Sequence, residues 1–234
     1  MFNDKRIIAM IPARGGSKSI PHKNIKLFCG KPLMVWTIEA AKKSKFLDEV
    51  VISTDDEEIK KVAIENKTKV IDRPEEFATD TAKMVGVIEH AINEIGKNFD
   101  YLVLLQPTSP FRTADTIDKT IELAIKNNCD RLLTVSENRS FFWIKEGERF
   151  KTLFKNQSRN RQERTPLYKE NSCVYVIEIE SFMKNKKIVP DDSDRIYFYT
   201  IDDIESIDIN DEKDFQLSEL MFKEIRCDGE NKDR

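Results

Sequence analysis

Cysteine and histidine are scarce in this sequence, and neither occurs at the spacing of a metal site. The two histidines, His22 and His90, have no cysteine or aspartate at ligand spacing. The cysteines form no CxxC pair, which excludes the usual zinc-binding pattern; they are Cys29, Cys129, Cys173 and Cys227. Because 234 residues can bury a stable core without cross-links, nothing in the sequence requires disulfide bonds.

Long apolar runs and an excess of one charge are also missing. No segment approaches the roughly 18 consecutive apolar residues of a membrane-spanning helix. The apolar run at residues 7–13 ends at Arg14 and is too short for the core of a secretory signal, so we expect a cytoplasmic protein without a membrane partner. The 39 basic and 42 acidic residues nearly cancel, to a formal net charge of −3. This balance argues against broad nucleic-acid binding but leaves room for a local pocket that binds a small anion.

Strand and helix patterns alternate along the chain. Short apolar or β-branched runs predict strands at residues 6–11, 49–53, 69–71, 101–106, 131–135, 172–179, 196–201 and 206–209. Amphipathic spacing predicts helices at residues 31–44 and 55–66, from a cap at Thr79 or Asp80 to Ile95, from a cap at Thr113 or Asp115 to Asn127, and at 211–226. This order predicts one α/β domain at residues 1–227, with a mostly parallel sheet between helices, and a tail at 228–234. Ligands bind beyond the carboxyl ends of such strands, here at the loops after Ile11, Ser53, Gln106 and Ile209.

Residues 137–170 interrupt this alternation. The segment contains an aromatic cluster, Phe141–Trp143, and a cationic run consisting of Arg159, Arg161, Arg164 and Lys169. The aromatic cluster belongs either to the core or to an interface, and an exposed cluster of this kind is an association surface. We expect the segment to project from the core as an arm.

The loop after the first strand is rich in glycine and cations. It reads ARGGSKSIPHKN from Ala13 to Asn24. Its adjacent glycines let backbone amides turn towards a ligand without a Cβ in the way, and Arg14, Lys18 and Lys23 would add positive charge. It matches neither the Walker pattern GxxxxGK[ST] nor GxGxxG. The loop is therefore either a phosphate-binding loop of another kind or a glycine turn with solvated cations.

Five segments, in order along residues 7–214, share features with one enzyme family. They are IPARGGSKSIPHKN at 11–24, RP at 73–74 with ATDTA at 78–82, QPTSPFR at 106–112, the arm positions Arg161, Lys169–Asn171 and Tyr175, and SIDIN at 206–210. Together they resemble the signatures of the acylneuraminate cytidylyltransferase (CMP-sialic acid synthetase) family, whose members activate sialic acids and related nine-carbon 2-keto acids. Their number and order make the match more specific than any one motif.

The resemblance implies a Rossmann-like fold of the nucleotide-diphospho-sugar transferase type, a homodimer joined through the arm at 137–170, and transfer of CMP from CTP to the anomeric hydroxyl of N-acetylneuraminate. Such transfers need cations and a divalent metal, Mg²⁺ or Mn²⁺, on the phosphates. The implied nucleotide-binding residues are Ala13, Arg14, Gly15, Lys18, Lys23, Asn24, Arg73, Thr79 and Asp80. The implied sugar-binding residues are Gln106, Thr108, Ser109, Arg161, Lys169, Asn171 and Tyr175, with Arg161 and Lys169 on the carboxylate. Arg14, Lys23 and Asp208 would be catalytic, and Asp208 and Asn210 would hold the metal.

Several positions depart from the family pattern. Ser19 and Ser172 stand where glycine is usual, and Lys169 stands where we expect arginine. Asn210 replaces a second aspartate; its carbonyl can bind Mg²⁺ but carries no charge, and the adjacent Asp211 would face the other side of a strand. Legionaminic and pseudaminic acids are the alternative substrates. A catalytically impaired regulator that binds a nucleotide or sugar is the hypothesis from another class.

Overall fold

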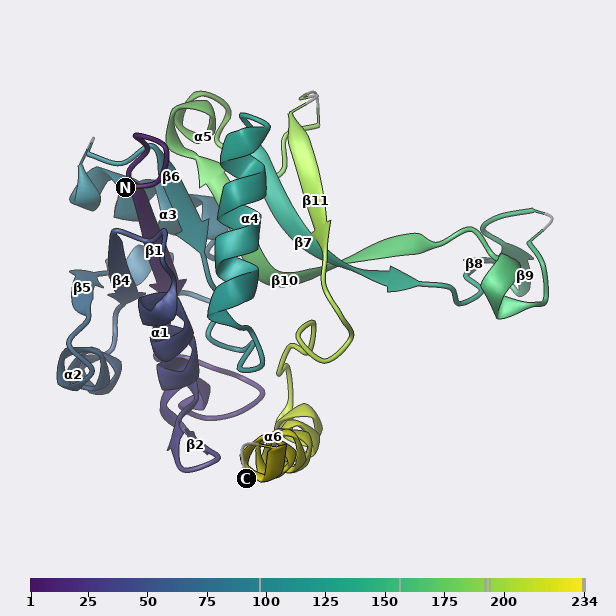
Figure 1. The fold of residues 1–234 in the computed structure, drawn as a ribbon, viewed down its shortest axis with the longest axis horizontal. Coiled ribbons are helices and arrows are strands. Elements are labelled where there is room, and N and C mark those ends of the chain that lie inside the picture. The colour runs from purple at the N-terminus through teal and green to yellow at the C-terminus, as the bar shows by residue number, and fades with distance from the viewer. Residues whose placement is uncertain (97, 156, 192, 194, 233–234) are drawn as a thin grey trace.

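The computed structural model describes residues 1–96, 98–155, 157–191, 193 and 195–232, with side chains as far as residue 225. Its main feature is a seven-stranded sheet in the order β11-β7-β10-β6-β1-β4-β5 (Figure 1). The strands are β1 (Ile7–Pro12), β4 (Glu49–Thr54), β5 (Lys69–Asp72), β6 (Tyr101–Leu104), β7 (Arg131–Asn138), β10 (Leu167–Glu178) and β11 (Ile196–Thr200). β10 runs antiparallel to β6 and β7, and the other neighbouring pairs are parallel. The predicted mostly parallel sheet is confirmed.

Helices cover both faces of the sheet and divide the apolar core in two. They are α1 (Leu33–Lys43), α2 (Glu57–Glu65), α3 (Met84–Ile95), α4 (Ala114–Lys126), α5 (Ile179–Asn185) and α6 (Glu212–Lys232). One core cluster joins α1, α2 and α4 to the sheet, through residues such as Ile38 and Ile59. The other joins α3 and α5 to the opposite face, through residues such as Ile88 and Phe182. β1 contributes to both clusters because successive side chains of a strand point to opposite faces.

The predicted helix caps hold for one helix and fail for another. At the start of α4, the Thr113 hydroxyl accepts a hydrogen bond from the Thr116 amide at 3.1 Å, as predicted. α3 follows Lys83 and has no side-chain cap. The prediction that Thr79 or Asp80 caps this helix is wrong, because both precede the helix by several residues and Asp80 forms ion pairs with the loop after β1 instead.

Three further segments differ from the predictions. Residues 206–209 form no strand; the Ile209 amide donates to the Thr108 carbonyl at 2.9 Å, so this segment lies against the loop after β6. α5 was not predicted, because its seven residues follow directly on β10 and continue its apolar pattern. α6 continues to Lys232 within the predicted tail 228–234, and residues 233–234 lie outside the described part of the chain.

A third apolar cluster fixes α6 to the body of the protein. The rings of Phe28 and Phe215 pack edge to face with centroids 5.5 Å apart, and those of Trp36 and Phe222 with centroids 4.7 Å apart. Ile209 is fully buried in the same cluster. The segment that precedes α6 is therefore held close to α1 and to the loop after β1.

β7 and β10 continue beyond the sheet as a two-stranded arm (Figure 1). The last paired residues are Leu167 and Asn138, and the register shifts between Glu170 and Tyr175. A short hairpin, β8 (Trp143–Glu146) and β9 (Arg149–Thr152), lies at the far end. A projecting segment is therefore present as expected, and its role in dimerisation stays a prediction.

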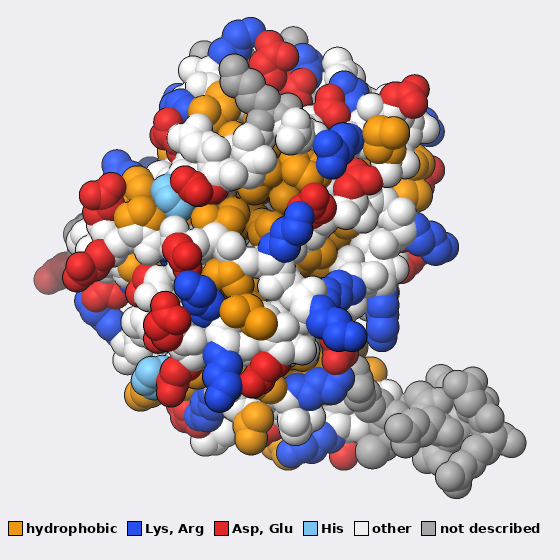
Figure 2. Space-filling view, turned by 90° about the vertical axis from the view of Figure 1, so that its left-hand side faces the viewer, with side chains coloured by type: hydrophobic (Ala, Val, Ile, Leu, Met, Phe, Trp, Pro, Cys, Tyr) orange, Lys and Arg blue, Asp and Glu red, His pale blue; other side chains and the backbone are white. Residues whose placement is uncertain are grey.

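Charged side chains of both signs are interspersed over the face that Figure 2 shows. This mixture agrees with the near balance of 39 basic and 42 acidic residues. Within the described ranges, no helix combines the length and the apolar character that crossing a membrane requires.

Candidate active site

The loops after β1 and β6 and the segment 206–210 meet at one edge of the sheet, where the parallel strands end. Lys23 Nζ donates to the Ile209 carbonyl at 2.9 Å, and Ser19 Oγ donates to the Asn210 carbonyl at 2.5 Å. The Ile209 amide reaches the Thr108 carbonyl on the other side. The start of β10 enters the same edge, because it runs antiparallel to β6. Residues from several predicted motifs therefore gather in one place.

The close packing of the 13–24 loop against α2 requires glycine at position 15. A Cβ on Gly15 would lie 2.4 Å from Oδ2 and 2.8 Å from Cβ of Asp56, whereas a Cβ on Gly16 would meet nothing within 4 Å. Asp56 cannot turn away freely, because its Oδ1 caps α2 by accepting from the Ile59 amide at 2.9 Å. The Gly15 amide itself donates to Asp55 Oδ1 at 3.1 Å. The end of β4 thus shapes this loop.

Two of the predicted phosphate-binding cations share one carboxylate. Arg14 Nη2 lies 2.9 Å from Asp80 Oδ1, and Lys18 Nζ lies 2.8 Å from Asp80 Oδ2. Hydrogen bonding, first from Lys18 and then from Arg14, holds the pKa of Asp80 below its ordinary value. Arg14 also donates to the Ala78 carbonyl at 3.3 Å, and its own carbonyl accepts from Asn24 Nδ2 at 3.0 Å. These contacts bring the ATDTA segment at 78–82 against the 13–24 loop, whose first residue, Ala13, is buried.

Lys23 is half-buried near two carboxylates. Burial lowers the pKa of Lys23 below its ordinary value of 10.5, while the charges of Asp208 and Asp214 act in the opposite direction. The hydrogen bond to the Ile209 carbonyl holds the ammonium at the segment that carries Asp208. A lysine with a lowered pKa among carboxylates, on the ligand-binding edge of an α/β sheet, is typical of a functional site.

Arg73 is buried against the end of β4. Its Nε donates to Ser53 Oγ at 3.1 Å, and its Nη2 donates to the Ser53 carbonyl at 2.6 Å. Burial lowers the pKa of Arg73 to about 10. Arg73 therefore holds the residues after β5 against β4, and its contact with a nucleotide stays a prediction. Thr79 is exposed, with its hydroxyl 3.4 Å from that of Thr81.

Asp208 has the oxygen best suited to a cation. Its Oδ1 is buried and has no hydrogen-bond partner among the described residues. Asn210 lies beside it and donates from Nδ2 to the Asp208 carbonyl at 3.2 Å. Asp211 is engaged elsewhere, because its Oδ1 accepts from the Asp214 amide at 2.9 Å at the start of α6.

The oxygen atoms at this edge fit a Mg²⁺ site in which the protein and the substrate both supply ligands. In the described ranges, no three His, Cys, Asp or Glu side chains are grouped so that they could hold a metal by themselves. Mg²⁺ is commonly bound through one or two carboxylates together with substrate phosphates and water. The unpartnered oxygen of Asp208 fits this arrangement.

Two of the predicted sugar-binding residues have buried polar atoms without a partner. They are Oγ of Ser109 and Nδ2 of Asn171, in the part of the chain that the structure describes. Asn171 is held through its Oδ1, which accepts from Thr134 Oγ1 at 2.7 Å and from the Cys173 amide at 3.2 Å. Buried polar atoms are normally paired, so such atoms point to a ligand or an ordered water. Burial raises the pKa of Cys173 to about 11, which agrees with its interpretation as a packing residue.

Tyr175 lies at the start of the buried part of β10. Its hydroxyl donates to Glu170 Oε1 and lies 3.1 Å from Ser172 Oγ. Burial, and then the hydrogen bond to Glu170, raise the pKa of Tyr175. Ser172 has φ 59°, a left-handed conformation that glycine adopts more easily. Gln106 and Thr108 are half-buried just after β6, on the facing loop.

The remaining two predicted sugar-binding residues, Arg161 and Lys169, belong to the arm. Arg161 begins the short helical turn η3 (Arg161–Glu163), between β9 and β10. Lys169 lies on the arm part of β10, opposite Ser136 of β7, and both cations are exposed. The hairpin of β8 and β9, which directly precedes this turn in the chain, lies at the far end of the arm (Figure 1).

Three side chains at the site have contacts that the sequence did not predict. Asp55 accepts from the Gly15 amide, Glu170 accepts from Tyr175, and Arg112 donates to three partners. The position of Asp55 just after a parallel strand was a usable signal. The contacts of Glu170 and Arg112 depend on how β10 pairs with its neighbours, which no local pattern specifies.

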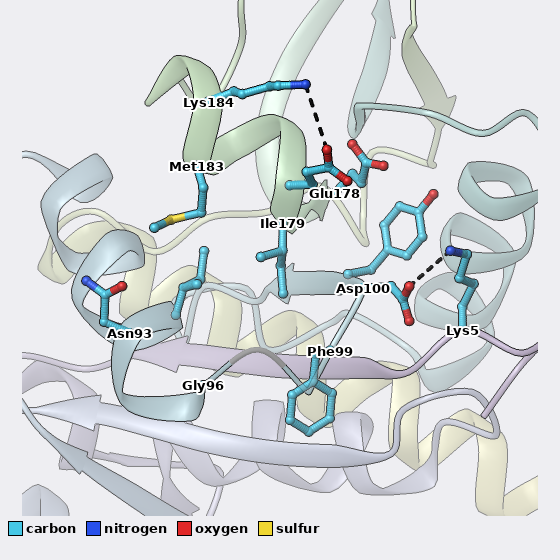
Figure 3. Close-up of a pocket in the computed structure, with 12 residues that line it drawn as sticks. Lys5, Asn93, Gly96, Phe99, Asp100, Glu178, Ile179, Met183 and Lys184 are labelled. Carbon is cyan, nitrogen blue, oxygen red and sulfur yellow. Dashed lines mark hydrogen bonds and ion pairs between the residues drawn. The ribbon is translucent and has the colours of Figure 1, made fainter.

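A cavity of about 750 Å³ lies at the opposite edge of the sheet (Figure 3). It is bounded by Tyr101, the first residue of β6, and Glu178, the last of β10. Ile179 and Met183 of α5 form part of its wall, and at its rim Lys5 pairs with Asp100 at 3.0 Å. None of the predicted site residues lines it, so it is separate from the candidate active site.

Comparisons with known proteins agree on one family. A family model described as cytidylyltransferase matches residues 8–226. CMP-N,N'-diacetyllegionaminic acid synthase of Legionella pneumophila is 33% identical over 227 residues, which cover 93% of this chain and 97% of that protein. N-acylneuraminate cytidylyltransferase of Escherichia coli O18:K1:H7 is 33% identical over 219 residues, 91% of this chain and 51% of that protein, so the chain spans about half of that relative. Pseudaminic acid cytidylyltransferase of Campylobacter jejuni is 33% identical over 177 residues, 72% of this chain and 76% of that protein.

A solved structure supports the same fold. The structure of CMP:2-keto-3-deoxy-manno-octonic acid synthetase complexed with CTP superposes with a TM-score of 0.70 at 14% sequence identity. The superposition covers 94% of this chain and 99% of the other. The predicted Rossmann-like fold of nucleotidyltransferases is confirmed.

Proposed function

Because the chain belongs to the cytidylyltransferase family, we propose that it transfers CMP from CTP to the anomeric hydroxyl of N-acetylneuraminate and releases pyrophosphate. One observation carries this proposal: loop cations and unpartnered polar atoms gather at the same edge of the sheet. Arg14, Lys18 and Lys23 suit a triphosphate. The unpartnered Oγ of Ser109 and Nδ2 of Asn171 suit the hydroxyl and amide groups of a sugar.

The loop cations would neutralise charge on the phosphates. In this reaction the sugar hydroxyl attacks the α-phosphorus, and charge develops on the non-bridging oxygens and the leaving pyrophosphate. Arg14 and Lys18 would exchange Asp80 for phosphate oxygens. Their side chains are 33% and 78% exposed, so solvent screens both ion pairs and they stabilise the free protein little. A donor aimed at transition-state charge is worth about 2.7–4 kcal/mol, so the exchange favours catalysis.

We propose Mg²⁺ as the cofactor, with Mn²⁺ as a substitute. Asp208 would hold the metal through its unpartnered oxygen, and Asn210 would offer a carbonyl oxygen beside it. The metal would supply further positive charge to the phosphate oxygens. Lys23 would keep Asp208 in place, because its ammonium is bonded to the next residue of the same segment.

Legionaminic acid is the second candidate substrate, because the relative from L. pneumophila is matched over 97% of its own length. Pseudaminic acid is the third, on the match to the C. jejuni enzyme. We prefer N-acetylneuraminate because residues 168–175, YKENSCVY, resemble the sialic-acid branch of the family. The three acids share the carboxylate and the anomeric hydroxyl, so the choice depends on the groups that face the other substituents.

The arm would join two copies of the chain. Its far end exposes large apolar side chains, with Trp143 exposed by 53% and Phe150 by 64%, as in an association surface. In such a dimer, Arg161 and Lys169 of one copy would reach the sugar of the other. The guanidinium of Arg161 can hold a carboxylate through two parallel hydrogen bonds, which fixes the orientation of the anomeric centre.

Pyrophosphate release tests the proposal. The purified protein is supplied with each of the four nucleoside triphosphates and with each of the three acids, with and without Mg²⁺. Release that requires CTP, one of the acids and Mg²⁺ is expected, whereas equal turnover with UTP or ATP would contradict the proposal. CTP binding without turnover of any acid would favour the catalytically impaired regulator, the hypothesis that Asn210 supports.

A further inference from the structure

Arg112 is a buried cation that contacts two of the segments that form the candidate site, and it has no role in the reaction described so far. Only 4% of the surface of Arg112 is exposed to solvent. Nη1 donates to the Cys173 carbonyl at 2.6 Å, and Nη2 donates to Thr37 Oγ1 at 2.6 Å and to the Gln106 carbonyl at 3.1 Å. Its Nε is buried and has no partner among the described residues. The guanidinium is therefore held by neutral oxygens from three separate segments.

Those three segments carry both halves of the proposed sugar site. Gln106 lies in the loop after β6, where Ser109 has its unpartnered hydroxyl. Cys173 lies in β10 two residues after Asn171, which has the unpartnered amide nitrogen. Thr37 belongs to α1, accepts from Arg112, and itself donates from Oγ1 to the Gln106 carbonyl at 3.4 Å. The Gln106 carbonyl is therefore held by both Arg112 and Thr37.

Stability alone does not account for this arginine. Moving a cation out of water costs several kcal/mol, and replacing buried charged groups with apolar residues of similar volume is often neutral or stabilising. A planar guanidinium can hold two diverging carbonyls at a fixed spacing, which neither lysine nor an apolar residue can do. The spacing it fixes here is that between the Gln106 and Cys173 carbonyls, and hence between the loop that carries Ser109 and the strand β10 that carries Asn171.

We propose that Arg112 is a positioning residue that keeps the loop after β6 and the start of β10 at the distance required for Ser109 and Asn171 to contact the same sugar. This inference rests on the proposed function and refines it. Arg112 would act on the sugar through these two segments and would leave the nucleotide side unchanged, because its partners do not include the 13–24 loop.

Two substitutions and a matched control test the inference by kinetics. Arg112→Met removes the forked guanidinium and keeps an unbranched side chain. Arg112→Lys keeps the positive charge but loses the planar guanidinium. Arg131→Met is the control, because Arg131 is also buried, 1% exposed, and donates to main-chain carbonyls such as that of Ile188 at 2.9 Å, at the other end of β7. We expect kcat/KM for the sugar to fall about 100-fold in Arg112→Met and less in Arg112→Lys, because a misplacement of about 1 Å costs that much. The KM for CTP should stay within about threefold, and Arg131→Met should lower Tm without changing the sugar kinetics.

Hydrogen exchange separates this inference from the proposed function. In Arg112→Met, the amides of residues 106–112 and 171–175 should exchange faster together, while those of residues 13–24 exchange as in the wild type. If the wild-type protein turns over none of the acids, the proposed function fails, and the exchange result still decides whether Arg112 couples the two segments. Unchanged exchange in either segment of Arg112→Met overturns the inference. So does a KM for CTP that rises as much as kcat/KM for the sugar falls.

Discussion

Replacing Lys23 with methionine removes one charge from the proposed phosphate site and keeps most of the side chain. The substitution loses the hydrogen bond to the Ile209 carbonyl, and a hydrogen bond to a charged group is worth about 1.5–3 kcal/mol. It also removes the cost of desolvating the ammonium, so the two effects on folding oppose each other. The reaction has no such compensation: loss of a group that stabilises transition-state charge costs about 2.7–4 kcal/mol, or about 100- to 1,000-fold in rate. Lys23→Met should therefore fold with a Tm near that of the wild type and lose most of its activity.

The pH dependence of the reaction identifies the group. Burial lowers the pKa of Lys23 below 10.5, so its ammonium loses the proton at a lower pH than an exposed lysine does. The kcat/KM for CTP should fall on the alkaline side through this lowered pKa in the wild type, and this fall should be absent in Lys23→Met. At pH values between the pKa of Lys23 in the folded protein and 10.5, Lys23 is protonated more fully in the unfolded chain than in the folded protein. The contribution of Lys23 to the free energy of unfolding therefore rises with pH in that window.

Pyrophosphate release at varied CTP and pH, with circular dichroism as the check of folding, measures both effects. Lys26→Met is the matched control, because Lys26 lies two residues after the 13–24 loop but pairs with Glu212 at 2.7 Å. The control should keep kcat/KM for CTP within about threefold of the wild type. A folded Lys23→Met enzyme that also stays within about threefold, with an unchanged alkaline limb, would show that Lys23 is a solvated cation and refute the reasoning.

Further predictions concern the loop, the metal and the arm. Gly15→Ala should lower kcat by at least about tenfold, because a Cβ would lie 2.4 Å from Oδ2 of Asp56, the residue that caps α2. Gly16→Ala should keep most of its activity, because a Cβ there would meet nothing within 4 Å. Equal losses of activity in the two variants would contradict the steric argument. Asp208→Ala should abolish the response of pyrophosphate release to Mg²⁺, which a Mg²⁺ titration measures. Asp211→Ala should keep that response and destabilise α6 by about 1 kcal/mol, which appears as a lower Tm. Trp143→Asp should shift the particle mass in light scattering from dimer towards monomer, and a wild-type protein that is monomeric at micromolar concentration would refute the dimer.

The order of the elements and the loops that carry the candidate site were predicted from local patterns. Continuous apolar runs such as Ile7–Pro12 suit strands that are buried on both faces, and their alternation with amphipathic segments predicts a sheet covered by helices. The site loops follow from the same reasoning, because parallel strands end at a common edge. The glycines and cations of the 13–24 loop were visible in the sequence, which left open whether they form a phosphate-binding loop or a glycine turn with solvated cations.

The pairing of side chains across long stretches of sequence was decided by the tertiary structure. Lys23 and the Ile209 carbonyl are 186 residues apart, and Arg112 and the Cys173 carbonyl are 61 apart, so no local periodicity relates them. For the same reason, the segment 206–209 is irregular although its sequence pattern is typical of a strand. The Ile209 amide donates to the Thr108 carbonyl, and the Ile209 side chain packs in the third apolar cluster with residues of α6. Local sequence restricts what each residue can do, but a polar atom takes the partner that the packing of distant segments brings within hydrogen-bond distance.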